Sequence, residues 1–374
     1  MMPKGRKIQV IAGDAGGANA LWPVVAALRN SGAEVSLAGY AVAPALWRQR
    51  GEAVLELSAA TSVDDAFEML RAGGATVMLC GTSLNGLDLE RRFVLAARRA
   101  GIPSLALLDF WSNYRARFSS DGRNLDCLPD RIAVMDEQAR AEMQAEGFPA
   151  SILETTGQPL FDDLAHCRQA STPAARAATR QVMAVGDERW VLFASQPLRE
   201  VYGTAGSAGW LGYDELDIVP PLLSSLARIN EDMPLRLTLL PHPRESRSRC
   251  ASWLETLPWA ALAPSGMNNR ELVLAADLVI GMNSMLLMES ALLGTATLSV
   301  QLGLRGVDCL SISRAGKIPR VECAEALEGT LRNLLAEGQI RNRHLAGLES
   351  LPRPGKAAER VAELVNRMTC RETL

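Results

Sequence analysis

Short apolar runs alternate with stretches of helical spacing along the first 160 residues. Residues 8–12 form the first such run, and a glycine-rich segment at 13–19 separates it from a helical pattern over 20–30. Alternation of strands and helices predicts βαβ units and a parallel sheet. Further strands are predicted at 34–39, 54–57, 76–81, 104–108, 131–135 and 151–155, and further helices at 63–72, 89–100 and 137–146.

The same alternation begins again near residue 190. The polar, alanine-rich stretch from Asp163 to Thr179 contains Pro173 and predicts a linker. Two Rossmann-like domains facing a cleft are therefore expected, spanning 1–165 and 181–350, with a linker at 166–180 and a closing helix within 351–374. In the second half, strands are predicted at 190–194, 235–240, 259–263, 278–281 and 297–301, and helices at 219–230, 269–275, 285–293 and from 355 onward.

Composition narrows the class of protein. The chain has 374 residues, of which 48% are hydrophobic, and a net charge of -3. That balance is ordinary for a globular protein, and a mildly acidic chain is a poor candidate for binding nucleic acid. No apolar run approaches the ~20 residues needed to span a bilayer, so a cytoplasmic protein is expected, with peripheral contact at the inner face of the membrane left open. Seven scattered cysteines without a CxxC pair and only three histidines predict neither a disulfide framework nor a metal site.

Ligands of open parallel sheets bind beyond the carboxyl ends of the strands. In the first half, this rule singles out Asp14, Asn19, Asp109 and Asp136. For Asp136, a helix cap is the better interpretation. The glycine segment at 13–19 lacks the Gly-Lys-Ser/Thr of a P-loop and the spacing of GxGxxG. It allows either a ligand to approach the backbone or a tight turn packed against a helix, and both interpretations stay open.

In the second half, the same rule selects Ser195, His242 and the pair Asn283–Ser284. His242 lies between two prolines and could donate a hydrogen bond to a phosphate oxygen. Asn283 and Ser284 fall where a helix N-cap is expected, next to N–H groups that suit a phosphate. Glu289 follows in a largely apolar helix and therefore needs a partner, for which a ribose diol is one candidate.

These features resemble the GT-B superfamily, which holds nucleotide-sugar-dependent glycosyltransferases and the non-hydrolysing UDP-N-acetylglucosamine 2-epimerases. The resemblance rests on the two α/β halves, His242, and the Ser284…Glu289 helix that follows residues 277–281. It implies that the second half binds a nucleotide-diphosphate sugar as co-substrate, with no cofactor or metal. The implied donor-binding residues are Ser195, Gln196, His242, Asn283, Ser284 and Glu289, the last of them on the ribose.

The chain departs from the epimerases, whose serine is followed by a glycine pair, because Met285 and Leu286 follow Ser284 here. This favours a glycosyltransferase that moves a sugar to a glycan or lipid-linked acceptor in bacterial-type surface polysaccharide synthesis. The alternatives are an epimerase-like enzyme or nucleotide-sugar hydrolase, and a non-catalytic nucleotide-sugar-binding module.

A base is expected in the first half, because an inverting transferase must deprotonate the acceptor hydroxyl. Asp109 is the leading candidate and Asp14 the second, while His242 would stabilise the leaving diphosphate. Arg115 and Arg117 could bind an anionic acceptor, and a solvated basic turn is an equally good interpretation of the two. The residues expected to bind the acceptor are Asn19, Trp111, Tyr114 and Arg115.

Overall fold

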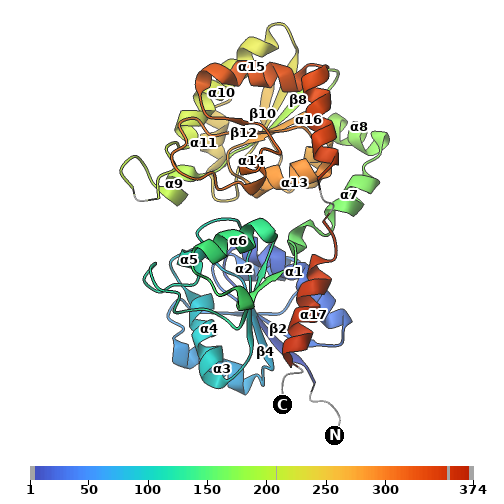
Figure 1. Ribbon diagram of the computed structural model, residues 1–374. Helices are drawn as coiled ribbons and strands as arrows, with labels where there is room; N and C mark the ends of the chain where they lie inside the picture. The colour runs from blue at the N-terminus through green and yellow to red at the C-terminus, as the bar shows by residue number, and fades with distance from the viewer. Residues whose placement is uncertain (1–4, 208, 352–353, 370–374) are drawn as a thin grey trace. The chain divides into compact units, whose positions relative to one another are not determined.

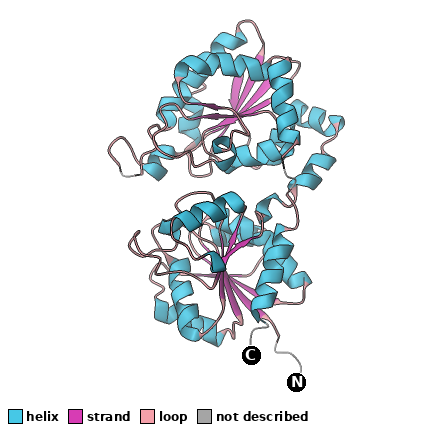
Figure 2. Cartoon of the chain, in the orientation of Figure 1, coloured by secondary structure: helices cyan, strands magenta, loops and turns pink. Residues whose placement is uncertain are grey.

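The computed structural model describes residues 5–207, 209–351 and 354–369 (Figures 1 and 2). The chain divides into two compact units: unit 1 consists of 1–163 and 354–374, and unit 2 of 164–353. Each unit contains one fully parallel sheet with helices packed on both of its faces (Figure 2). The predicted α/β class with two Rossmann-like domains is therefore confirmed.

The sheet of unit 1 has the strand order β3-β2-β1-β4-β5-β6-β7. Later strands are added first on one side of β1 and then, from β4 onward, on the other. The order thus reverses between β1 and β4, which is where a doubly wound sheet opens a crevice for ligands. The strands are β1 (Lys7–Ala12), β2 (Glu34–Gly39), β3 (Val54–Glu56), β4 (Val77–Cys80), β5 (Ser104–Leu107), β6 (Arg131–Val134) and β7 (Leu153–Thr155). The helices are α1 (Ala15–Asn30), α2 (Ala43–Gln49), α3 (Val63–Ala72), α4 (Leu89–Ala100), α5 (Tyr114–Arg117), α6 (Glu137–Ala145) and α17 (Ala357–Thr369).

Helix α17 completes unit 1, although it follows all of unit 2 in the sequence. It packs beside α1 (Figure 1), and its buried Val361 and Val365 join the same core as Val24 and Leu28 of α1. The carboxylate of Asp162 accepts hydrogen bonds from the first two N–H groups of the helix, at 2.9 and 2.7 Å. Burial of one apolar face and a side-chain cap at the N-terminus thus fix the helix in place.

The sheet of unit 2 repeats this topology, with the strand order β10-β9-β8-β11-β12-β13. Its order reverses between β8 and β11. The strands are β8 (Arg189–Ala194), β9 (Leu235–Leu240), β10 (Ala260–Leu262), β11 (Leu278–Gly281), β12 (Thr297–Val300) and β13 (Arg320–Val321). The helices are α7 (Leu164–Ala170), α8 (Pro173–Val182), α9 (Leu198–Tyr202), α10 (Glu215–Asn230), α11 (Arg247–Ser252), α12 (Asn269–Ala275), α13 (Met285–Leu293), α14 (Ser311–Arg314), α15 (Ala324–Leu335) and α16 (Gln339–Glu349).

The stretch expected as a linker, 166–180, is helical and belongs to unit 2. Pro173 is the first residue of α8, a position that a helix tolerates because its N–H would have no partner there, and Thr172 caps the helix. Arg176 and Arg180 of α8 donate hydrogen bonds to the carboxylate of Asp277, at 2.7 and 3.0 Å. Ion pairs to the base of β11 therefore bind α8 to the domain.

Two helices begin earlier than the sequence pattern predicts. Helix α1 starts at Ala15, so most of the expected glycine loop is its first turn. Helix α10 starts at Glu215 rather than 219, because Asp214 and Asp217 form a reciprocal capping box ahead of two prolines. Capping outweighs the breaking tendency of the prolines, which lie early in the helix.

The structure bears on membrane-spanning helices and on disulfides only in the residues that it describes. Within it, no helix is both long and apolar enough to cross a bilayer. None of the six described cysteines is joined to another in a disulfide. Cys370 lies outside the described residues.

Candidate functional sites

Three glycines at the start of unit 1 let other protein groups touch the backbone. A Cβ added to Gly13 would lie 2.2 Å from the ring of Tyr40, and one added to Gly16 would lie 2.2 Å from Oδ2 of Asp109. A Cβ on Gly17 would lie 3.5 Å from the Cα of Gly81. The segment therefore packs closely against Tyr40, Asp109 and Gly81, and the approach of a ligand to its backbone stays a prediction.

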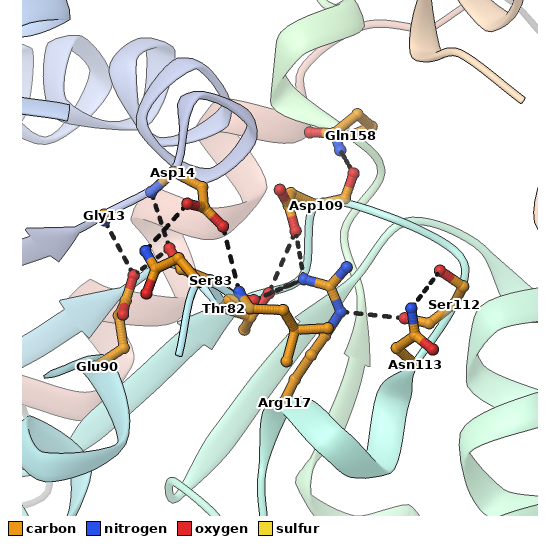
Figure 3. A network of polar contacts seen from close by, with 12 residues as sticks. Gly13, Asp14, Thr82, Ser83, Glu90, Asp109, Ser112, Asn113, Arg117 and Gln158 are labelled. Carbon is orange, nitrogen blue, oxygen red and sulfur yellow. Dashed lines mark hydrogen bonds and ion pairs between the residues drawn. The ribbon is translucent and has the colours of Figure 1, made fainter. Parts of the chain in front are cut away.

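A buried carboxylate that sequence reasoning missed joins the segments at the β1–β4 switch point (Figure 3). Glu90 of α4 is 4% exposed, and its Oε1 accepts hydrogen bonds from the N–H of Gly13 at 3.0 Å and from Oγ of Ser83 at 2.6 Å. The hydroxyl of Tyr40 donates to Oε2. Burial raises the pKa of Glu90, and these donors counteract that effect. Glu90 thereby fixes the backbone that leads into α1.

Asp14 stands at the N-cap position of α1, yet its side chain does not cap the helix. Instead, its two carboxylate oxygens accept hydrogen bonds from the backbone N–H of Leu84, at 3.2 Å, and from Nδ2 of Asn85, at 3.0 Å. Its own N–H donates to Ser83 at 2.9 Å. The Asp14 carboxylate is thus held at the carboxyl end of β4.

Asp109, which follows β5, is held by contacts from three segments (Figure 3). Its Oδ1 accepts hydrogen bonds from Nη1 of Arg117, at 3.0 Å, and from Oγ1 of Thr82, at 3.2 Å. Its backbone oxygen accepts one from Nε2 of Gln158 at 3.0 Å. The side chains of Asp109 and Arg117 are 14% and 8% exposed, so this ion pair is largely buried.

The aromatic residues expected to bind an acceptor are buried, and that expectation is wrong. Trp111 and Tyr114 are each 3% exposed, so neither ring offers a face to a sugar. The indole N–H of Trp111 donates to Asp136 at 2.7 Å, and the hydroxyl of Tyr114 donates to Glu142 at 2.6 Å. Asp136 also accepts a hydrogen bond from the third N–H of α6, which confirms its predicted role as a helix cap.

Asn19 and Arg115 also form hydrogen bonds within unit 1. Oδ1 of Asn19 accepts a hydrogen bond from Arg50 at 2.8 Å. The guanidinium of Arg115 donates to the backbone oxygens of Arg123, at 2.8 Å, and of Glu146. These contacts hold loops and helix ends together. Arg115 is thus bonded to the protein backbone, which differs from both a side chain open to an acceptor and one in a solvated basic turn.

In unit 2, a pair of side chains joins the ends of β8 and β11 at the switch point. Nε2 of Gln196 donates to Oδ1 of Asn283 at 2.9 Å, and the backbone N–H of Asn283 donates to Oε1 of Gln196 at 3.0 Å. Asn283 is 3% exposed, and its Nδ2 is buried without a hydrogen-bond partner among the described residues. Since buried donors are nearly always paired, this amide is a candidate for contact with a ligand.

Ser284 caps helix α13, as the sequence predicts. Its Oγ accepts a hydrogen bond from the N–H of Leu286 at 3.2 Å. The helix ends at Gly294, which adopts the left-handed conformation with φ of 84°. The positive end of the α13 dipole therefore lies at the same sheet edge as Asn283.

His242 is held as a neutral hydrogen-bond donor. Its Nδ1 accepts a hydrogen bond from the N–H of Arg244 at 3.2 Å, which leaves the ring hydrogen on Nε2. Burial and the positive charge of Arg244 lower the pKa of His242. Glu245 fixes the loop, because its Oε2 accepts from the N–H of His242 and its Oε1 from Oγ of Ser195, both at 2.8 Å.

Glu289 needs a partner, as expected, but the partner is a protein side chain. Its Oε2 accepts a hydrogen bond from Nε of Arg270 of α12 at 2.9 Å, and its side chain is 14% exposed. Burial raises the pKa of Glu289, while Arg270 counteracts this. A ribose would have to compete with the arginine for this carboxylate.

Several residues at the two sheet edges escaped the sequence analysis. Thr82 and Ser83 directly follow a buried strand, so the strand-end rule could have found them. No local signal marks Glu90 or Glu245, and none predicts the pairing of Arg117 with Asp109, because these contacts join distant segments. Among the described residues, no three His, Cys, Asp or Glu side chains gather as a metal site would require.

The comparisons with known proteins concern the fold. No protein-family model and no curated protein sequence matches this chain. A UDP-GlcNAc 2-epimerase from Neisseria meningitidis bound to UDP-GlcNAc is similar in structure, with a TM-score of 0.69, 13% identity, and 96% of this chain and 100% of that chain covered. A putative UDP-N-acetylglucosamine 2-epimerase from Listeria monocytogenes gives a TM-score of 0.71 at 16% identity, over 99% and 98%. MurG from Acinetobacter baumannii gives 0.60 at 13% identity, over 97% and 99%.

These likenesses extend over nearly the whole chain, while the identities are far too low to carry an activity across. They establish that the chain has the two-domain α/β fold shared by GT-B glycosyltransferases and UDP-GlcNAc 2-epimerases. The expected GT-B-like fold is thereby confirmed. Function depends on the sites, since one fold hosts many activities.

Proposed function

We propose that the chain is an enzyme acting on a nucleotide-diphosphate sugar, and that unit 2 binds the nucleotide diphosphate. The observation that carries this proposal is the unpartnered, buried Nδ2 of Asn283 at the N-terminus of α13. Gln196 fixes the other end of that amide. A phosphate oxygen would supply the missing acceptor, and the helix dipole favours its negative charge.

His242 is suited to stabilise a diphosphate leaving group. A neutral imidazole with its hydrogen on Nε2 can donate to a phosphate oxygen as negative charge builds up there. Ser195 acts through Glu245, which holds both loops in register. Glu289 stays outside the proposed site, because its carboxylate is paired with Arg270.

For the reaction, we propose glycosyl transfer to a hydroxyl of a glycan or lipid-linked acceptor, as in bacterial-type surface polysaccharide synthesis. The acceptor oxygen bonds to the anomeric carbon, and its proton passes to a carboxylate, for which Asp109 is the first candidate. The bond between that carbon and the diphosphate oxygen breaks, and its electron pair leaves with the diphosphate. Asp14 is the second candidate for the base.

The donor site is tested by calorimetric titration with UDP-, GDP- and CMP-sugars, after a thermal-shift screen of the same panel. Asn283→Asp keeps the acceptor oxygen for Gln196 but replaces the Nδ2 donor with a negative oxygen, and His242→Ala removes the other donor. We expect both to weaken binding of the selected nucleotide sugar by tenfold or more, on the order of one charge-assisted hydrogen bond. The exposed His166, changed to Ala, is the control.

Wild-type affinity in both variants would contradict the proposed site. Asp109→Asn then separates an enzyme from a non-catalytic module: it should retain binding and lose nucleotide release. Full turnover in that variant would exclude Asp109 as the base, and a wild-type protein that binds without any turnover would support the module.

A second candidate, epimerisation of the sugar, is favoured by the two carboxylates at one sheet edge. Asp14 is the cap residue of α1, and Oδ2 of Asp109 lies against Gly16 in the first turn of the same helix. Inverting a carbon centre requires groups that remove and return a proton. Incubation with UDP-GlcNAc in D2O without acceptor distinguishes the two: an epimerase yields UDP-ManNAc, a hydrolase releases free sugar, and a transferase leaves the substrate unchanged.

A further inference from the structure

The two oxygens of the Asp109 carboxylate have different surroundings. Oδ1 accepts two hydrogen bonds, from Arg117 at 3.0 Å and from Thr82 at 3.2 Å. Oδ2 has no hydrogen-bond partner among the described residues, and it lies against the backbone of Gly16. The side chain of Asp109 as a whole is 14% exposed.

Arg117 is itself fixed so firmly that it cannot release Oδ1 by turning away. Its Nε donates to the backbone oxygen of Ser112 at 3.0 Å. Its Nη1 donates to the backbone oxygen of Thr82 at 2.6 Å and to Oγ1 of the same residue at 3.1 Å. These partners lie in the loops after β4 and β5. A planar guanidinium with several simultaneous partners holds one orientation better than any other cationic side chain.

We propose that Arg117 is a positioning residue, which occupies Oδ1 of Asp109 and directs Oδ2 toward the acceptor hydroxyl. This inference rests on the proposed function, in which Asp109 takes the acceptor proton. A carboxylate held through one oxygen presents the other at a defined place, which proton transfer requires. The absence of a side chain at residue 16 is what lets Oδ2 lie this close to the start of α1.

The charged groups near Asp109 decide what removal of Arg117 does. Arg117 of α5 is the cation in contact with it. Asp14 adds negative charge from the start of α1, and Glu90 of α4 lies behind Ser83. Loss of Arg117 removes the cation that pairs with the Asp109 carboxylate and leaves its Oδ1 with only the Thr82 hydroxyl as a donor.

The test uses the full chain with Arg117→Met, Arg117→Lys and a matched control, Arg91→Met. Arg91 of α4 donates to the backbone oxygens of Ala116 and Ser119 beside α5, yet has no contact with Asp109. Two quantities are measured with a panel of glycan and lipid-linked acceptors: kcat and KM for nucleotide release from the sugar nucleotide found in the binding screen.

In Arg117→Met, we expect catalysis to fail while substrate binding survives, because Oδ2 of Asp109 is no longer held in place. At pH 7, kcat should fall at least tenfold with little change in KM for the nucleotide sugar. Arg117→Lys keeps the charge but loses the second arm, so kcat should again fall with little change in KM. If Arg117→Met does not fold, Arg117→Lys alone tests whether Arg117 positions Asp109.

The control should lose thermal stability only. An unchanged kcat in Arg117→Met, or an equal loss of kcat in Arg91→Met, would overturn the proposal. Full turnover by Asp109→Asn would overturn the proposed base instead.

Discussion

At the scale of single residues, the glycines of the α1 segment show how a motif obtains its meaning from distant neighbours. In the sequence, the glycine-rich segment at 13–19 allows either a ligand-binding loop or a tight turn. In the structure, Tyr40, Asp109 and Gly81 approach these positions instead. Gly16 lies in the first turn of α1 and adopts no left-handed φ, so only the nearby carboxylate demands a glycine there.

Gly16→Ala is therefore predicted to destabilise the protein, although alanine is the better helix former. Its Cβ would lie 2.2 Å from Oδ2 of Asp109 and force the ion pair with Arg117 to shift. We expect a loss of about 1–3 kcal/mol in the free energy of unfolding, measured by urea denaturation.

The matched control is Gly329→Ala in α15, where an added Cβ meets nothing within 4 Å. That change should stabilise the protein by about 0.5–1 kcal/mol. If Gly16→Ala behaved like Gly329→Ala, the close approach of Asp109 would be disproved.

Sequence reasoning reached the positions of the candidate residues but not their partners. Asp14, Asp109, His242 and Asn283 were selected because they follow predicted strands, and the structure places each at the carboxyl end of its sheet. Whether such a residue is available depends on contacts between distant segments, which no local pattern encodes. Trp111 and Glu289 are examples. The sequence lets each be expected to bind a ligand, but Trp111 is buried and Glu289 is paired with Arg270.

At the scale of elements, helix ends are decided by specific side chains. The predicted helices at 63–72, 89–100 and 285–293 match α3, α4 and α13, because glycine or a capping residue marks their ends. The start of α1 was misplaced, since glycines there suggested a loop. Helix α15 was missed, although Leu327, Leu331 and Leu334 follow a helical spacing that predicts it.

The cap that Asp162 provides to α17 leads to a prediction at this scale. Asp162→Ala should leave the first two N–H groups of the helix unpaired and lower the free energy of unfolding by about 1–2 kcal/mol. Hydrogen exchange should quicken in α17 before it does so in the sheet of unit 1. Glu363→Ala, on the exposed side of the same helix, is the control and should change neither quantity.

A second prediction at this scale concerns His344 of helix α16 and the dependence of stability on pH. Nε2 of His344 accepts a hydrogen bond from the N–H of Thr297, and burial together with Arg341 lowers the pKa of His344 to about 4. Between pH 6.5 and 4, the unfolded chain therefore binds the proton more readily than the folded one. Stability should fall across this window by about 2 kcal/mol, after allowance for the partial exposure of the ring.

His344→Gln preserves an acceptor for Thr297 but cannot titrate. The variant should match the wild type near pH 7.5 and exceed its free energy of unfolding near pH 4.5. Denaturation curves at the two values measure the difference, with the exposed His166→Gln as the control. An identical loss on acidification in wild type and His344→Gln would refute the assignment.

At the scale of the whole molecule, the two units share one topological plan. In each sheet, strands are added first to one side of the opening strand and then to the other, so the order reverses once. The candidate residues gather where it does: Asp14 and Ser83 in unit 1, Gln196 and Asn283 in unit 2. The sequence could predict this plan because hydrophobic period and the alternation of strands and helices are local properties. The membership of α8 in unit 2 depends instead on ion pairs with the distant Asp277.

The return of α17 to unit 1 has a consequence for how the protein is made. A ribosome synthesises all of unit 2 before residues 357–369 emerge, so unit 1 must wait for its last helix. Until then, Val24 and Leu28 of α1 lack the covering provided by Val361 and Val365. The first unit to be synthesised is therefore the last to be completed, and during translation it presents an apolar strip on which chaperones can act.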